Sequence, residues 1–250
     1  MSSLSSIYRH IGRYTLMLVN VFTKPERRSV YRKLIVDEID KIGIQSLGIV
    51  ALLSLFMGAV VTLQTAANID SGWIPKWTIG FTTRQTMILE FSSTIVCLIL
   101  SGKVGSNIAS EIGTMRITEQ IDAMDIIGVN SSSYLILPKI IAAVLIFPFM
   151  VIIAMACGIV AGALIGTSTG VISLSNYEYG LTYYFEPFQV TYTLIKSVVF
   201  AFIITSVSSY HGYYTKGGAL EVGQSSTRAV VYSIILIMIS NYIITQLLLL

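Results

Sequence analysis

The chain has 250 residues, of which 54% are hydrophobic and only 12% are charged. Soluble domains carry roughly twice that charged fraction, and the mean hydropathy of +0.76 is also far from a soluble composition. These values exclude an ordinary soluble enzyme, and the net charge of +3 needs no nucleic-acid partner to explain it. We predict an all-α integral membrane protein, because the apolar runs do not alternate as barrel strands do.

The first predicted unit, residues 1–41, is rich in cations and contains an amphipathic helix. Its apolar residues recur every three or four positions, as on one face of a helix; they are Leu4, Ile7, Ile11, Tyr14, Leu18 and Val21. Arg9 and Arg13 fall beside or opposite this stripe, which favours a helix in the membrane interface with its cations toward lipid phosphates. The alternative is a helix that packs on other protein.

Five membrane-spanning helices are predicted in the following domain, residues 42–250. Crossing the hydrocarbon core takes roughly 20 apolar residues, and the predicted spans cover about residues 42–67, 85–106, 135–166, 190–212 and 227–249. Of the 16 Lys and Arg, 13 precede the first span or lie in the connections after the second and fourth spans and in the span ends that border them. Positive charge collects on the cytoplasmic side, so we expect a cytoplasmic N-terminus and a periplasmic C-terminus.

The connection between the second and third spans predicts a short cytosolic helix over about residues 110–127. Its apolar and charged positions fall on separate helical faces. The apolar ridge is Ile117, Ile121, Met124 and Ile127, and the charged stripe is Arg116, Glu119, Asp122 and Asp125. A solvated surface helix would also carry charges. We favour a docking helix for another protein, because nothing compels so ordered a pattern in a connection between membrane spans.

Glu90 interrupts the second apolar span, and a carboxylate at that depth is costly and tends to be functional. Arg84 and Lys196 are the cations available in the same half of the membrane. Three interpretations remain open for Glu90: a structural ion pair, a polar group lining a cavity, and a proton-coupling site. The last would make the protein a proton-coupled secondary transporter.

The loop after the fourth span is rich in glycine and contains Gly217, Gly218, Glu221 and Gly223. The pattern G-x-x-x-x-G-K-[ST], which cradles nucleotide phosphates, does not occur in the sequence. A tight cytosolic turn is therefore the better interpretation, and energy from ATP must come through another subunit. The sequence also presents no nucleophile–base set and no metal-ligand spacing, which counts against an intramembrane enzyme.

Aromatic residues concentrate in the predicted outer loop before the fourth span. They are Tyr177, Tyr179, Tyr183, Tyr184, Phe185, Phe188 and Tyr192. An aromatic belt at the membrane–water boundary is the better interpretation, and a contact surface for a partner outside the membrane is the alternative.

Two stretches carry a more specific pattern. They are GKVGSNIASEIGTMRITEQIDAMDIIGV at residues 102–129 and GYYTKGGALEVGQSSTRAVV at residues 212–231. Together they resemble the MlaE (YrbE-like) family of lipid ABC-transporter permeases. Shorter matches at residues 12–20 and 196–202 extend the resemblance over nearly the whole chain, in the expected order.

The resemblance implies a non-enzymatic permease subunit that forms a homodimer and binds no cofactor itself. An ABC ATPase subunit, which binds ATP and Mg²⁺, would dock on the cytosolic segment. The residues implied in that coupling are Glu111, Gly113, Thr114, Met115, Arg116, Glu119, Gln120 and Asp122. An MCE-domain periplasmic protein would exchange phospholipid with this multi-pass inner-membrane protein, and lipid would pass between the inner and outer membranes.

The sequence departs from the family pattern around Glu90 and near its end. Leu89 stands where the family usually has Arg, Ser92 replaces Gly and Ser93 replaces Pro. This chain therefore lacks the Arg that would pair locally with Glu90 and the Gly-Pro pair that would break the helix. Asn241 stands where many members carry Asp, so a charge-dependent role is not transferred to it. Glu90 and Lys196 remain the predicted intramembrane polar residues of a lipid cavity.

Overall fold

The computed structural model describes residues 2–23, 28–69 and 74–249, and the side chains of residues 8–23, 31–69 and 74–249. Within these ranges the chain is helical with short connections and contains no strand. Five helical stretches are long and apolar enough to cross a membrane: Tyr31–Asn68, Trp77–Ile117, Ser131–Ser168, Pro187–Tyr213 and Ala219–Leu248. The predicted all-α membrane fold with five spans is therefore confirmed.

The first two spans are each built from α-helical pieces joined by wider π-helical turns. The first consists of α2 (Arg28–Ile39), η1 (Asp40–Ile44) and α3 (Gln45–Asn68). The second consists of α4 (Trp77–Thr86), η2 (Met87–Ile95), α5 (Val96–Leu100), η3 (Ser101–Gly105) and α6 (Ser106–Ile117). Both helical stretches extend beyond the predicted apolar cores, because the helices continue through their charged ends.

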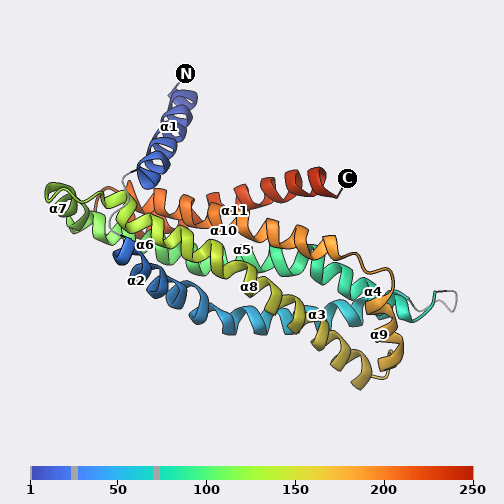
Figure 1. The fold of residues 1–250 in the computed structure, drawn as a ribbon. Coiled ribbons are helices and arrows are strands. Elements are labelled where there is room, and N and C mark those ends of the chain that lie inside the picture. Colours follow the sequence, from blue (N-terminus) through green and yellow to red (C-terminus); the bar gives the residue numbers. More distant parts are fainter. Residues whose placement is uncertain (1, 24–27, 70–73, 250) are drawn as a thin grey trace.

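The remaining helices complete an elongated bundle (Figure 1). They are α1 (Ser2–Phe22), α7 (Gln120–Ile126), α8 (Ser131–Ser168), α9 (Leu174–Thr182), α10 (Pro187–Tyr213) and α11 (Ala219–Leu248). Figure 1 shows α7 at one end of the bundle and α9 at the other, and we name these the α7 end and the α9 end. Helix α1 extends away from the bundle near the α7 end.

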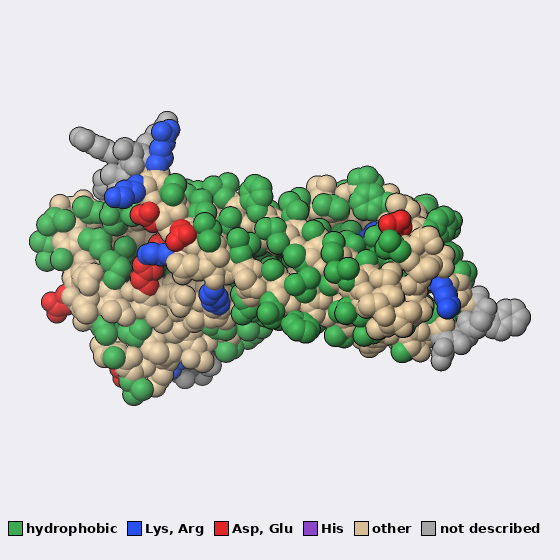
Figure 2. All heavy atoms as spheres, turned by 90° about the horizontal axis from the view of Figure 1, so that it is seen from below, with side chains coloured by type: hydrophobic (Ala, Val, Ile, Leu, Met, Phe, Trp, Pro, Cys, Tyr) green, Lys and Arg blue, Asp and Glu red, His purple; other side chains and the backbone are tan. Residues whose placement is uncertain are grey.

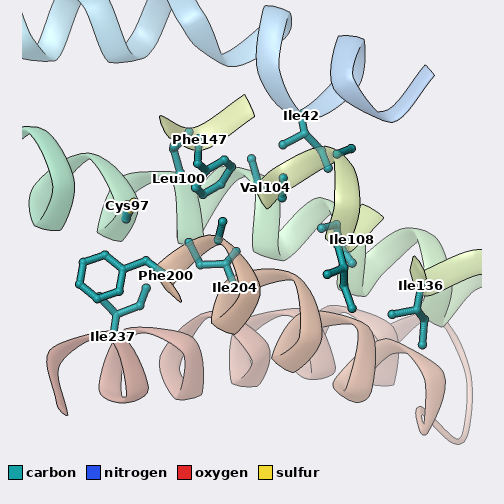
Figure 3. Close-up of a cluster of buried hydrophobic side chains, with 14 of the residues drawn as sticks. Ile42, Cys97, Leu100, Val104, Ile108, Ile136, Phe147, Phe200, Ile204 and Ile237 are labelled. Carbon is teal, nitrogen blue, oxygen red and sulfur yellow. The ribbon is translucent and has the colours of Figure 1, made fainter. Parts of the chain in front are cut away.

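The core lies where the five spans meet, and α10 packs against α6, α8 and α11. Figure 3 shows side chains from all five spans pointing toward one another, including Leu100, Phe147, Phe200 and Ile237. The first and third spans approach most closely at Gly58 and Gly158, where a Cβ on Gly58 would collide with the backbone of Gly158. Small residues allow such backbone approach between membrane helices, as the glycine spacing in α8 indicates.

The π-helical turns change where backbone carbonyls point, and side chains from other spans bind them. A π turn inserts an extra residue and disrupts the regular i→i−4 ladder. In η2, Thr193 Oγ1 donates to Ile88 O at 2.8 Å and Lys196 Nζ donates to Leu89 O at 3.1 Å. Lys103, which lies in η3, donates to Gln45 O just after η1. Buried carbonyls thus have partners without a break in the spans.

Helix α1 packs against the bundle through its C-terminal half. Met17 and Val21 are buried in the core, and Tyr14 shares a hydrogen bond of 2.8 Å with Ser206 on α10. Burial raises the pKa of Tyr14, so its hydroxyl stays protonated. Ile11, on the predicted stripe, is 57% exposed; Leu4 and Ile7 lie outside the described side chains. One half of the stripe therefore packs on protein, and its contact with lipid remains a prediction.

The surface has the polarity of a membrane protein. Figure 2 shows charged side chains gathered toward the two ends of one face, with hydrophobic side chains across the middle. The fifth span, α11, is the least covered by the rest of the protein. Only 11% of its most apolar 18-residue stretch is buried, against 33% to 56% in the other four spans. Its apolar face is therefore available to lipid or to another protein.

Candidate functional site: an intramembrane polar cluster and the α7 end

Glu90 lies in η2, and its carboxylate meets polar side chains from two other spans. Glu90 Oε1 lies 3.1 Å from Nζ of Lys196 on α10. Glu90 Oε2 accepts hydrogen bonds from Thr94 Oγ1 at 2.8 Å and from Asn241 Nδ2 on α11 at 3.3 Å. The second, fourth and fifth spans are thus joined by one polar cluster, which we call the Glu90 cluster: Glu90, Thr94, Lys196 and Asn241.

The Glu90 cluster is closed on one side and open on the other. The side chain of Lys196 is 0% exposed, whereas that of Glu90 is 43% exposed. Lys196 Nζ also lies 4.9 Å from the centre of the Tyr192 ring, a favourable cation–π distance. The buried ammonium is therefore compensated by the Glu90 carboxylate, the Leu89 carbonyl and an aromatic face, as a buried charge requires. The open side of Glu90 can accept a hydrogen bond from a ligand.

Arg84 does not take part in this cluster. Its guanidinium donates to Leu181 O at 2.6 Å and Tyr183 O at 3.0 Å, at the C-terminal end of α9. A cation at that position complements the partial negative charge of a helix C-terminus. Arg84 therefore holds α9 against α4, and Lys196 is the cation that pairs with Glu90.

The departures around Glu90 have a structural explanation. Lys196, on another span, supplies the cation that pairs with Glu90. Leu89 contributes only its backbone carbonyl, which accepts a hydrogen bond from Lys196 Nζ. Ser93 retains the backbone N–H that proline would lack, and the helix widens into η2 without breaking. Asn241 contributes an amide donor to Glu90 where a second carboxylate would bring like charges together.

The α7 end divides the predicted single helix into two. Helix α6 ends at Ile117, and α7 begins at Gln120, because Glu119 adopts a left-handed backbone with φ of 61°. A salt bridge of 2.6 Å between Arg116 and Asp122 spans the break. The expected apolar ridge is divided as well: Ile121 is fully buried, whereas Ile127 is 75% exposed. Ile126, which is not part of that ridge, is 85% exposed.

Seven of the eight predicted coupling residues fall into two groups. Thr114, Glu119, Gln120 and Asp122 are exposed around the break, with Arg116 half-buried beside them. Gly113 and Met115 instead face the protein, where a Cβ on Gly113 would come within 3.2 Å of Val222 on α11. The exposed group can contact a partner directly, and the second group positions α6 on α11.

Glu111 belongs to a charge network that the sequence pattern did not reveal. Lys139 Nζ on α8 lies 2.6 Å from Glu111 Oε2 and 2.7 Å from Glu38 Oε1 on α2. Lys41 lies 3.5 Å from Glu111 and 3.8 Å from Glu38. We call these four residues the Lys139 network; it links the first three spans at the α7 end. Glu38 and Lys139 are far apart in sequence, so helical spacing gave no signal for this network.

The glycine loop forms the start of α11. Gly217 has a φ of 114°, a conformation that favours glycine, and Gly218 is the residue before the helix. The carboxylate of Glu221 accepts from Gly218 N at 2.8 Å, which caps the helix N-terminus. A Cβ on Gly223 would meet open space. This geometry is that of a turn and helix cap.

Comparison with known proteins assigns the family. The family model described as Permease MlaE matches residues 35–247. A probable ABC transporter permease protein of Rickettsia bellii is 38% identical over 237 residues, covering 95% of this chain and 91% of the relative. An intermembrane phospholipid transport system permease protein, MlaE, of Haemophilus influenzae is 28% identical, with 95% and 91% covered.

A plant protein is also similar. The chloroplastic protein TRIGALACTOSYLDIACYLGLYCEROL 1 of Arabidopsis thaliana is 31% identical over 210 residues, covering 84% of this chain and 60% of that protein. The five spans and the polar cluster within them define a multi-pass membrane permease. The chain belongs to the MlaE permease family.

Proposed function

We propose that this chain is the membrane subunit of an ABC transporter that moves phospholipid between the inner and outer membranes. The observation that carries the proposal is the match to the Permease MlaE model over residues 35–247. The relative from Haemophilus influenzae is named for intermembrane phospholipid transport. Because the sequence contains no phosphate-binding loop of the G-x-x-x-x-G-K-[ST] type, a separate ATPase subunit binds ATP and Mg²⁺.

The α7 end is the docking surface for that ATPase. Two large apolar side chains, Ile126 and Ile127, project from it beside the exposed charges of Glu119 and Asp122. An apolar anchor with a polar rim is the usual composition of a protein–protein contact. The Arg116–Asp122 salt bridge ties α7 to α6, so a push on α7 is transmitted to the second span.

The excess of Lys and Arg supports a cytoplasmic position for the α7 end. The N-terminus is then cytoplasmic and the C-terminus periplasmic. Inner-membrane residence follows from the proposed transport between two membranes.

A homodimer encloses the lipid passage. The poorly covered apolar face of α11 supports a second copy at this position, because a dimer would bury it. Asn241 on α11 and the open side of Glu90 then line the wall, where they bind polar headgroup atoms while apolar side chains accommodate the tails.

The α9 end receives the MCE-domain periplasmic protein. Trp77 and Tyr183 rings lie 4.3 Å apart, and Tyr179 lies 5.8 Å from both. Tyr179 and Tyr183 are 54% and 44% exposed. Exposed aromatic clusters serve both the membrane–water boundary and partner contacts, and the rigid support from Arg84 suits a docking platform.

The docking role is tested by substitution at α7. The double substitution Ile126→Asp and Ile127→Asp removes the apolar anchor from an exposed site, so folding is retained and ATPase co-purification falls at least about tenfold. Leu174→Asp is the matched control, because Leu174 is 52% exposed on α9 at the opposite end. Unchanged ATPase recovery with the double variant would refute the docking surface.

A further inference from the structure

A basic cavity of about 830 Å³ lies near the α7 end, between α1, the last turns of α10 and the first half of α11. Its cationic and imidazole side chains come from all three helices and from the loop between α10 and α11. They are Arg9, His10, Arg13, His211, Lys216 and Arg228. The Glu90 cluster and the predicted coupling residues Glu111 to Asp122 do not line it, so this cavity is separate from both proposed working sites.

The four cations of the cavity lack an acidic partner in the described part of the chain. The ion pairs found there involve neither Arg9 and Arg13 nor Lys216 and Arg228. Glu221 is the one carboxylate among the described residues that line the cavity, and its Oε2 accepts a hydrogen bond from Gly218 N. Among the described residues the cavity thus has four cations against one carboxylate, which leaves a surplus of positive charge.

The walls are aromatic and hold several polar groups in place. His10 Nδ1 lies 2.7 Å from the hydroxyl of Tyr210, and the Arg13 guanidinium lies 5.9 Å from the centre of the Tyr214 ring. The His211 ring stacks on Tyr232 with centroids 5.2 Å apart and planes at 13°. Arg13 and His10 are thus positioned across from the rings of α10.

Polarity changes along the cavity. Lys216 and Gln224 lie at the loop end of α10 and α11, whereas Val207 and Leu236 lie further along the two spans. Helix α1 adds one aliphatic side chain to the lining, Ile11. A cationic rim that continues into an apolar wall matches a lipid, with a phosphate at the rim and acyl chains deeper.

We propose that this cavity binds the phosphate headgroup of an anionic phospholipid from the membrane leaflet at the α7 end. Arg9, Arg13, Lys216 and Arg228 neutralise the phosphate, and the tyrosine and histidine rings surround the headgroup. The apolar part of the cavity favours a lipid over free phosphate. The surplus of cations favours an anionic lipid over a second copy of this chain, because two such cationic surfaces would repel each other. Bound lipid fixes α1 to α10 and α11. The site is distinct from the proposed passage and needs no ATPase.

The test uses full-length protein in detergent, titrated with phosphatidylglycerol and followed by native mass spectrometry. The variant combines Arg13→Gln and Arg228→Gln, which come from opposite walls of the cavity. We expect about tenfold weaker retention of phosphatidylglycerol or more, since each cation near an anionic lipid surface contributes appreciably to binding. Phosphatidylcholine should bind equally to variant and parent.

The matched control combines Arg32→Gln and Lys33→Gln, which are exposed on α2 and lie outside the cavity. It removes the same charge from the molecule and should retain phosphatidylglycerol like the parent. Equal loss in both double variants, or no loss in either, overturns the proposal. Competition by inorganic phosphate at concentrations near those of the lipid would identify a soluble-anion site instead. A change in oligomeric state without a change in lipid retention would identify a contact between copies.

Discussion

The Glu90 cluster and the Lys139 network use the same chemistry for different purposes. Both centre on a lysine that is almost fully buried, with side-chain exposures of 0% for Lys196 and 4% for Lys139. Lys139 lies between two carboxylates, of which Glu38 is 11% exposed and Glu111 is 43% exposed. Lys196 has a single carboxylate partner, which is 43% exposed.

The two clusters differ in how many carboxylates compensate the buried lysine. Buried charges are tolerated when partners surround them, and removing one partner is costly. The Lys139 network joins three spans, and its central lysine is enclosed by two carboxylates. The Glu90 cluster satisfies its lysine but leaves part of its carboxylate accessible. Loss of the lysine should therefore cost more stability where the buried Glu38 depends on it than where the carboxylate partner, Glu90, is exposed.

The largest effect is expected at Lys139. Lys139→Met would leave the buried Glu38 carboxylate close to Glu111 without the central cation, so the free energy of unfolding should fall by about 3–5 kcal/mol. Denaturant titration of the purified protein in detergent measures this loss. Lys41→Met is the control, because Lys41 is 54% exposed and should cost no more than about 1 kcal/mol. Similar losses in the two variants would show that Lys139 is not the centre of the network.

A smaller effect is expected at Lys196. Lys196→Met leaves Glu90 without its cation, but the exposed carboxylate can be hydrated and keeps its bonds to Thr94 and Asn241. The free energy of unfolding should therefore fall by about 1–3 kcal/mol, less than for Lys139→Met in the same titration. A loss as large as that at Lys139 would erase the distinction between the two regions.

The smallest stability effect is expected at Asn241. Asn241→Leu removes a neutral donor from Glu90 Oε2, and the free energy of unfolding should fall by about 0.5–1.5 kcal/mol. Because Asn241 is proposed to line the passage, phospholipid recovered with the purified assembly should decrease as well. Tyr242→Leu is the control, since Tyr242 is 70% exposed on the adjacent position of α11. Unchanged lipid recovery with Asn241→Leu would exclude the amide from the passage.

The sequence predicted the fold well because charge-poor runs of spanning length leave few alternatives in lipid. It also singled out Glu90 and Lys196, since charges within apolar spans are rare. Their pairing depends on how α10 lies beside η2, which no local pattern encodes. Thr94 gave no comparable signal, and Asn241 stood out only because it departs from the family pattern.

At the α7 end, the local sequence pattern was not sufficient to predict the structure. Residues 110–127 contain a regular amphipathic period, yet Glu119 interrupts it with a left-handed backbone and no glycine or proline marks the position. The Arg116–Asp122 bridge across the break, together with burial of Ile121, accompanies this geometry. The Lys139 network was equally hidden, because Glu38 and Lys139 are brought together by packing of α2 on α8.

The most direct test of the central claim is phospholipid transfer in proteoliposomes containing this chain, with and without its ATPase and MCE-domain partners. The account predicts transfer that requires the ATPase and ATP hydrolysis, and that is lost when Ile126 and Ile127 are replaced by Asp. Transfer against a gradient by this chain alone, driven by a proton gradient and abolished by Glu90→Gln, would contradict the account and establish a proton-coupled transporter.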